Sequence, residues 1–210
     1  MNENIKDKII FFLLGVLLGI ATTIFGGIYA YKMVKGGGVA SSKAPAAQQA
    51  PKFSLGDSKT LQLSFENKED LGFFQPSEKA TLSIVDSHAT EGNNSLQVTI
   101  PAGSEYPGLE WETYGKDTIS FKGKSAFSLN VYNNTEDIIP IEVKFKSGKN
   151  YPKKSYALPF VLQPLQDNHI SVPVDQLAEA LDVSQISYIK IFTKSPPVNF
   201  YLYIDEIKLK

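Results

Sequence analysis

The chain contains no cysteine and no arginine, and it has only one tryptophan and two histidines among 210 residues. Without cysteine it has no disulfides, thiolate nucleophiles or cysteine-bound metals, and its sequence suits an oxidising or a reducing compartment equally. Without arginine it lacks the forked guanidinium that binds a carboxylate or phosphate through two parallel hydrogen bonds. The net charge of −1 offers no basic stripe, so we expect no nucleic-acid partner.

Motifs for catalysis are also missing from the sequence. His88 and His169 lie far apart and belong to no metal-binding array, and no nucleophile elbow or glycine-rich phosphate loop is present. The acids Glu110 and Glu112 share one strand face, which surface charge explains more simply than a glycosidase pair does. We therefore expect a non-catalytic protein.

The N-terminal part contains one long apolar run, residues 9–31, which has 23 residues and no charge. A helix of this length spans about 34 Å, enough to cross a hydrocarbon core of roughly 30 Å. The alternative is a cleavable signal peptide that ends near residues 38–40 (Gly-Val-Ala). The run is longer than a signal-peptide core, which favours a membrane anchor.

The anchor prediction divides the chain into four parts. A short tail covers residues 1–8, the transmembrane helix 9–31, a flexible linker rich in Gly, Ala, Ser and Pro 32–58, and a globular domain 59–210. Within the apolar run, small residues recur at every fourth position, a pattern that lets two membrane helices approach closely and form a homo-oligomer. These residues are Gly15, Gly19, Thr23 and Gly27.

The globular domain is organised around Ser125–Gly148, where apolar and polar residues alternate in two runs. Within each run the apolar side chains share one strand face, because side chains alternate with period two. They are Phe127, Leu129 and Val131 in the first run and Ile141, Val143 and Phe145 in the second. Residues 133–137 (Asn-Asn-Thr-Glu-Asp) suit a turn, so the stretch predicts a two-stranded hairpin with one apolar face.

Short strands and turn signals continue on both sides of this stretch. A loop is expected over Gly72–Glu78 and one short helix over Asp175–Leu181. About nine strands with one helix predict an all-β fold, an antiparallel β-sandwich of the jelly-roll type. The other predicted strands are Leu61–Glu66, Ala80–Asp86, Ser95–Ile100, Gly108–Glu112, Ser155–Leu162, His169–Val174, Ser187–Thr193 and Val198–Lys210.

Seven segments in order carry a resemblance to a known family. They are SFE (64–66), EGNNSLQVTI (91–100), EYPGLEW (105–111), AFSLNVYN (126–133), HISVPVDQL (169–177), ISYIKIF (186–192) and FYLYIDEIKL (200–209). Together they resemble the galactose-binding-like jelly rolls, which include many bacterial carbohydrate-binding modules. The resemblance implies a domain that binds a carbohydrate or cell-envelope polymer. It also favours an extracytoplasmic C-terminal domain. The lysines that flank residues 9–31 do not settle the orientation, and if anything they lean against export of the C-terminus.

The same resemblance implies a structural calcium site. In such modules an acid from the first strand, the Gly-Asn turn and an Asp of the last strand often converge. The matching positions are Glu66, Asn93 or Asn94, and Asp205. Carboxylate and carbonyl oxygens are the ligands that calcium prefers. The alternative is that these acids cap turns or face water.

A sugar-binding face needs aromatic rings and amide or carboxylate groups on one surface. If the strands that carry them are neighbours, the polar and aromatic outer positions gather into such a face. The predicted ligand-binding residues are Asn130, Tyr132, Tyr188, Phe192, Tyr201 and Tyr203. Strands favour aromatic residues in any case, so the same residues also suit an ordinary sandwich surface. The alternative function is a structural or protein-interaction subunit of a cell-envelope assembly.

Overall fold

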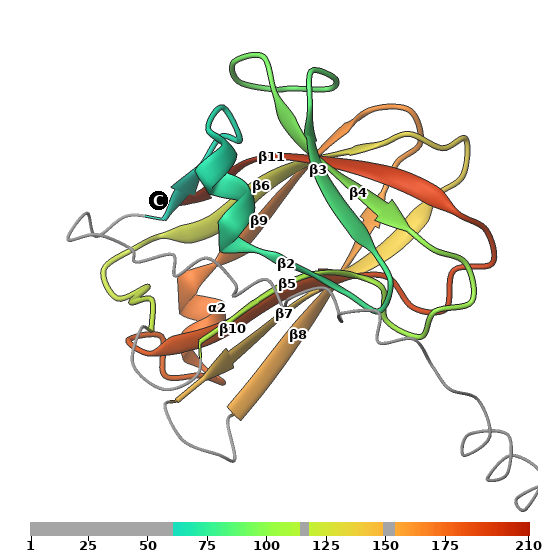
Figure 1. The fold of residues 1–210 in the computed structure, drawn as a ribbon. Coiled ribbons are helices and arrows are strands. Elements are labelled where there is room, and N and C mark those ends of the chain that lie inside the picture. The colour runs from blue at the N-terminus through green and yellow to red at the C-terminus, as the bar shows by residue number, and fades with distance from the viewer. Residues whose placement is uncertain (1–60, 114–117, 149–153) are drawn as a thin grey trace, which may run out of the picture. The chain divides into compact units, whose positions relative to one another are not determined.

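The computed structural model describes residues 61–113, 118–148 and 154–210, which form an all-β sandwich of two antiparallel sheets (Figure 1). The elements in chain order are β1 (Gln62–Leu63), η1 (a 3-10 helix, Lys68–Phe73), β2 (Gln75–Ser77), β3 (Thr81–Val85), β4 (Ser95–Ile100), β5 (Gly108–Glu112), β6 (Ala126–Asn133), β7 (Ile139–Ser147), β8 (Lys154–Leu162), β9 (Asp167–Pro173), α2 (Val174–Ala178), β10 (Ile186–Phe192) and β11 (Phe200–Leu209).

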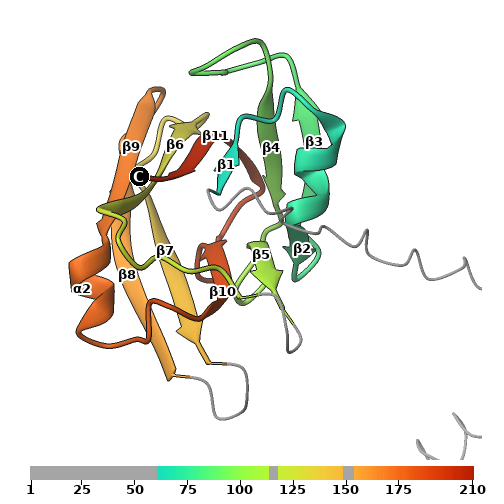
Figure 2. The same cartoon turned by 90° about the vertical axis from the view of Figure 1, so that its left-hand side faces the viewer.

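The first sheet has the strand order β3-β4-β11-β6-β9, with β1 added to β11, and the second has the order β2-β5-β10-β7-β8. The chain passes back and forth between the sheets, so most consecutive strands are not hydrogen-bonded neighbours. Figure 2 shows β9, β6, β11 and β4 in one layer and β8, β7, β10 and β5 in the other. The prediction of an antiparallel jelly-roll sandwich is confirmed.

The two inner faces meet in one aromatic and aliphatic core. Phe127 of β6 and Phe145 of β7 face each other edge to face with ring centroids 5.3 Å apart. Phe121 lies 6.0 Å from each of them, and all three side chains are fully buried. The alternation read from the sequence therefore identified the inward positions of both strands correctly.

The predicted hairpin over Ser125–Gly148 is wrong in its pairing. β6 pairs with β11 and β9, whereas β7 pairs with β10 and β8, so the two strands lie in opposite sheets. Two strands can bury their apolar faces against each other in facing sheets, or they can lie side by side in one sheet and both face the opposite layer. The sequence pattern does not separate these cases.

The connection between β6 and β7 is held by a buried amide. Asn133 has no exposed surface. Its Nδ2 donates to the carbonyl of Asp137 at 2.8 Å, and its Oδ1 accepts from the backbone N–H of Thr135 at 3.0 Å. The residues read as a hairpin turn thus carry the chain from one sheet to the other.

One smaller prediction also changes. The loop expected over Gly72–Glu78 contains the short edge strand β2, which pairs with β5. The predicted transmembrane helix 9–31 and the linker 32–58 lie outside the described residues. Within the described ranges, no helix is long and apolar enough to cross a membrane.

Candidate binding groove

The structure does not bring the six predicted ligand-binding residues together. Asn130 and Tyr132 lie on β6, and Tyr201 and Tyr203 lie on β11, in the first sheet. Tyr188 and Phe192 lie on β10 in the second sheet. One shared face required β6, β10 and β11 to be neighbours in one sheet, and β10 is not in the sheet that holds β6 and β11. The sequence assigned each residue to an outer face, but two sheets have two outer faces.

On the first sheet, the rings of Tyr132 and Tyr203 are packed together under a loop residue. His88 stacks on Tyr132 with ring centroids 3.8 Å apart and lies 4.4 Å from Tyr203. Tyr203 is only 9% exposed, and its hydroxyl accepts a hydrogen bond from Gln97 at 3.1 Å. Tyr201 is 45% exposed and is the open ring of this group.

The Asn130 amide lies in a hydrogen-bond network beside these rings. Its Nδ2 donates to the hydroxyl of Thr90 at 3.0 Å and to Glu206 at 2.5 Å, and its Oδ1 lies 2.8 Å from His169 Nδ1. Lys208 forms ion pairs with Glu206 and, at 2.8 Å, with Glu91. These contacts engage both ends of the amide and fix the loop before β4 on the sheet.

Of the three predicted calcium ligands, Glu66 and Asp205 hold the same loop at two points, and Asn93 is part of that loop. Glu66 Oε1 accepts from the backbone N–H groups of Asn93 and Asn94, each at 2.8 Å. Asp205, which is 1% exposed, accepts from the backbone N–H groups of Thr90 and Glu91 at 2.8 and 3.0 Å.

The two carboxylates therefore face N–H donors in this arrangement. In the described ranges, no group of three or more His, Asp or Glu side chains is arranged to hold a metal ion. A calcium ion needs oxygen lone pairs, and Glu66 Oε1 and Asp205 Oδ2 each already accept two or more hydrogen bonds. Calcium at Glu66, Asn93 and Asp205 stays a prediction.

The second sheet carries a shallow groove of about 280 Å³ on its outer face. It is lined by Tyr106, Glu142, Lys144, Tyr188, Lys190, Phe192 and Lys194. These residues come from β7, β10 and the segments next to β5 and β10. In each strand they alternate with buried core residues such as Val143 and Ile189, so the groove lies on the face turned away from the core.

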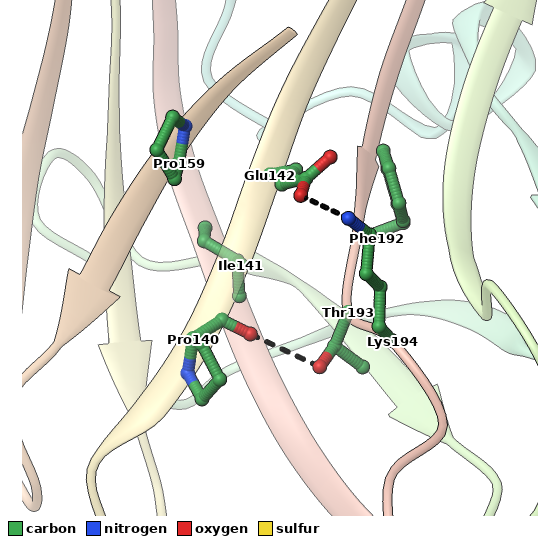
Figure 3. Close-up of a pocket in the computed structure, with 7 residues that line it drawn as sticks. All are labelled: Pro140, Ile141, Glu142, Pro159, Phe192, Thr193 and Lys194. Atoms are coloured by element: carbon green, nitrogen blue, oxygen red, sulfur yellow. Dashed lines mark hydrogen bonds and ion pairs between the residues drawn. The ribbon is translucent and has the colours of Figure 1, made fainter.

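A smaller pocket of about 130 Å³ shares Glu142, Phe192 and Lys194 with the groove and extends it toward the start of β7 (Figure 3). Pro140 and Pro159 form its apolar wall. The carbonyl of Pro140 accepts a hydrogen bond from the Thr193 hydroxyl at 3.0 Å, which ties β7 to the end of β10. The two hollows together make one long, open surface across the sheet.

Two of the lysines in the groove are paired with carboxylates. The ammonium of Lys190 lies 3.7 Å from Glu110, whose carboxylate also accepts a hydrogen bond from the Tyr188 hydroxyl at 2.9 Å. Lys194 contacts Glu142 at 2.5 Å, and this hydrogen bond raises the pKa of Lys194 above its ordinary value. The groove is therefore polar, with fixed donors and acceptors.

Tyr106 is the exposed ring of the groove. It is 37% exposed, and its ring meets Phe192 edge to face at 5.8 Å. Its backbone N–H donates to Glu78 at 2.6 Å, and the backbone N–H of Thr193 donates to the carbonyl of Pro107 at 3.2 Å. These bonds fix the segment before β5 against the end of β10. A hydrogen bond with Glu105 raises the pKa of the Tyr106 phenol.

Sequence reasoning missed Tyr106 because it lies in a loop, where strand alternation gives no signal. Gly108, two positions later, was a usable clue. A Cβ on Gly108 would lie 2.0 Å from the carbonyl oxygen of Ile191 and 2.8 Å from the Cα of Phe192. A glycine inside a strand often marks such a close backbone approach.

Comparison with known proteins confirms the fold. No protein-family model matches the chain, and no curated protein sequence matches it. Solved structures do match. A xylan-binding domain described as a family 22 carbohydrate-binding module superposes with a TM-score of 0.52 at 15% identity, over 70% of this chain and 91% of that one.

Two further structures show the same likeness. The family 11 carbohydrate-binding module of Clostridium thermocellum, solved with a mixed-linked tetrasaccharide, gives a TM-score of 0.51 at 15% identity and covers 71% of this chain and 94% of that one. An exo-beta-agarase gives 0.58 at 12% identity over 73% of this chain, but the match spans only 24% of that enzyme. The sandwich thus has the fold of carbohydrate-binding modules, as its sequence resemblance implied.

Proposed function

We propose that this protein is a non-catalytic binding module for a polysaccharide and that the glycan lies in the groove of the second sheet. The observation that carries the proposal is the combination, on one open surface, of an exposed ring, Tyr106, with fixed carboxylates and ammonium groups. Binding sites commonly join an apolar surface to a few placed polar groups, which set the orientation of the ligand.

The likeness in fold supports this proposal but is not sufficient for it. The matched structures include a xylan-binding domain and a module bound to a tetrasaccharide, and both cover about seven-tenths of this chain. Because folds of this kind serve several functions, the evidence for glycan binding is the groove itself. The groove also has the extended, open shape that a polymer chain needs.

We further propose that the module works close to a membrane. Residues 9–31 would anchor it, residues 32–58 would act as a tether, and the sandwich would lie outside the cytoplasm. In this arrangement the protein holds an envelope polymer or other glycan near the membrane surface. Association through the small residues of the anchor would bring two or more modules together.

A protein-interaction role in a cell-envelope assembly is the second candidate. It is favoured by three exposed apolar side chains near the β6–β7 and β8–β9 connections. Ile138 and Val161 are each 58% exposed, and Leu165 is 54% exposed. Apolar groups on an outer surface are a common feature of protein contact sites.

A glycan array and affinity electrophoresis on the full-length chain test the main proposal. The protein is kept in a detergent that has no sugar headgroup, because a sugar headgroup would compete with the glycan for the groove. We expect at least one polysaccharide to bind, and Tyr106→Ala to weaken its affinity about tenfold, equivalent to about 1.4 kcal/mol. Tyr201→Ala, an exposed ring of the first sheet, is the matched control and should bind like the unchanged protein.

The variants separate the two outer faces. If Tyr201→Ala weakens binding and Tyr106→Ala does not, the glycan binds on the first sheet and the groove assignment is wrong. If no polysaccharide binds, while replacing Val161 and Leu165 by Ser abolishes a specific protein complex, the interaction role replaces glycan binding. Melting curves of each variant show whether a loss of binding reflects unfolding.

A further inference from the structure

Three rows of side chains cross the outer face of the second sheet. In the middle row, Lys190 of β10 lies directly opposite Glu110 of β5 on one side and Lys144 of β7 on the other. Like charges placed opposite each other on one sheet face are destabilising. Glu110 offsets the charge of Lys190, whereas Lys144 faces only Lys190 and Ala157 on the two neighbouring strands, so its charge has no counter-ion directly opposite.

The other ammonium groups of this face have partners in the fold. Lys190 pairs with Glu110, Lys194 pairs with Glu142, and the ammonium of Lys146 lies 3.9 Å from the centre of the Tyr188 ring. Lys144 differs from them. Its ammonium group has no hydrogen bond, ion pair or ring contact with any residue in the described part of the chain.

The rings in the floor of the groove are largely covered. Tyr188 is 6% exposed and Phe192 is 7% exposed. Lys190 Nζ lies 5.3 Å from the centre of the Phe192 ring, and Lys146 lies over Tyr188. Among the described rings that line the groove, a neutral glycan that stacks on aromatic rings would find only Tyr106 open. A ligand above Tyr188 and Phe192 meets ammonium groups first.

We infer that the groove selects an acidic polysaccharide and that a sugar carboxylate binds between Lys144 and Lys190. This inference rests on the proposed function and adds the chemical class of the ligand. The carboxylate would supply Lys144 with a counter-ion and separate it from Lys190 by a negative charge. An ammonium–carboxylate contact is a charge-assisted hydrogen bond, stronger than a bond to a neutral hydroxyl.

Polygalacturonate and its fully methyl-esterified form provide the most direct comparison, because they share a backbone and differ in charge. Alginate and hyaluronate, each with its carboxyl-reduced form, extend the test to other uronates, and a sulfated carrageenan tests a different anion. We expect at least one uronate polymer to bind at least about tenfold more tightly than its neutral form. Its affinity should fall several-fold between about 50 mM and about 300 mM NaCl, because salt screens partly exposed charges.

Variants of Lys144 then locate the anion. Lys144→Gln should weaken binding of that uronate about five- to tenfold and leave the neutral form unaffected, whereas Lys144→Arg keeps the charge and should retain most of the affinity. Lys68→Gln, which removes an exposed lysine from η1, is the control and should bind as the unchanged protein does.

The possible failures are distinguishable. Equal binding of an acidic polymer and its neutral form, with no effect of Lys144→Gln, would overturn the acidic-ligand inference and leave glycan binding intact. Tighter binding of the carrageenan than of every uronate would overturn the choice of a carboxylate. Failure of all these polymers and of the wider glycan array would overturn the proposed function itself.

Discussion

The carboxylate of Asp205 accepts a hydrogen bond of 2.8 Å from the backbone N–H of Thr90, a residue 115 positions earlier in the chain. Asp205 lies at the point where β11 departs from regular pairing with β6, and Glu206 has a positive φ of 50°. The buried acid therefore fastens the loop before β4 to an irregular part of the central strand.

Replacing Asp205 should destabilise the sandwich strongly. Asp205→Ala leaves the N–H groups of Thr90 and Glu91 without their acceptor. We expect the free energy of unfolding to fall by about 3 kcal/mol, because hydrogen bonds to charged groups contribute about 1.5–3 kcal/mol each and are not fully additive. Urea unfolding measures the change. Asp86→Ala, at an exposed position, should cost under about 0.5 kcal/mol, and an equal loss in both variants would contradict this role.

Glu66 should make the domain sensitive to acid. The backbone N–H groups of Asn94 and Asn93 stabilise its carboxylate and lower its pKa below 4.5. As the pH falls, the unfolded chain takes up this proton first, so the stability that Glu66 contributes above about pH 4.5 is lost as the pH falls through the folded pKa.

The comparison of the unchanged protein with Glu66→Gln isolates this contribution, because glutamine does not titrate. We expect the difference in unfolding free energy between the two proteins to be constant above about pH 6 and to shrink in the acid range. Chemical unfolding in a series of buffers measures it. A difference that stays constant down to about pH 3 would show that Glu66 does not have the expected lowered pKa.

Gly108 should be intolerant of any side chain. The first atom of a side chain there would collide with the backbone of Ile191 and Phe192, which cannot turn away as a flexible side chain can. Gly108→Ala should therefore reduce stability by about 2 kcal/mol or more and weaken glycan binding by moving β5 from β10. Ala157→Ser, an addition at an exposed position of β8, should be nearly neutral in thermal melts. Equal melting temperatures would show that β5 shifts at little cost.

Much of the fold followed from local patterns in the sequence. The strands over Ser95–Ile100 and Gly108–Glu112 match β4 and β5 in both bounds, because turn residues delimit each apolar run. The inward positions Phe127 and Phe145 were also predicted. Strand pairing was not predicted, because Leu129 and Val143 need only an apolar layer opposite them and carry no signal of which sheet they join.

The candidate groove was only partly predictable for the same reason. Tyr188 and Phe192 were identified as outer residues of β10, but their neighbours Glu110 and Lys144 depend on the β5-β10-β7 order. Tyr106 depends on a loop fixed by backbone bonds. Alternation therefore shows which side of a strand is available, whereas a binding surface also requires the strand order.

The buried Asn133 gives a last test, because it lies where the sequence suggested a hairpin and the structure shows a crossing between sheets. Asn133→Ala would remove the amide that accepts from the backbone N–H of Thr135 and donates to the carbonyl of Asp137, which would keep only the Thr135 hydroxyl as a donor. We expect a loss of about 1–3 kcal/mol in the free energy of unfolding, measured by urea denaturation, since each of the two lost hydrogen bonds contributes about 0.5–1.5 kcal/mol. The adjacent Asn134 is exposed, so Asn134→Ala should change stability by less than about 0.5 kcal/mol. If the two variants were equally stable, the Asn133 amide would not be what holds the crossing, and the packing of Val131 and Ile141 in opposite layers would have to fix it alone.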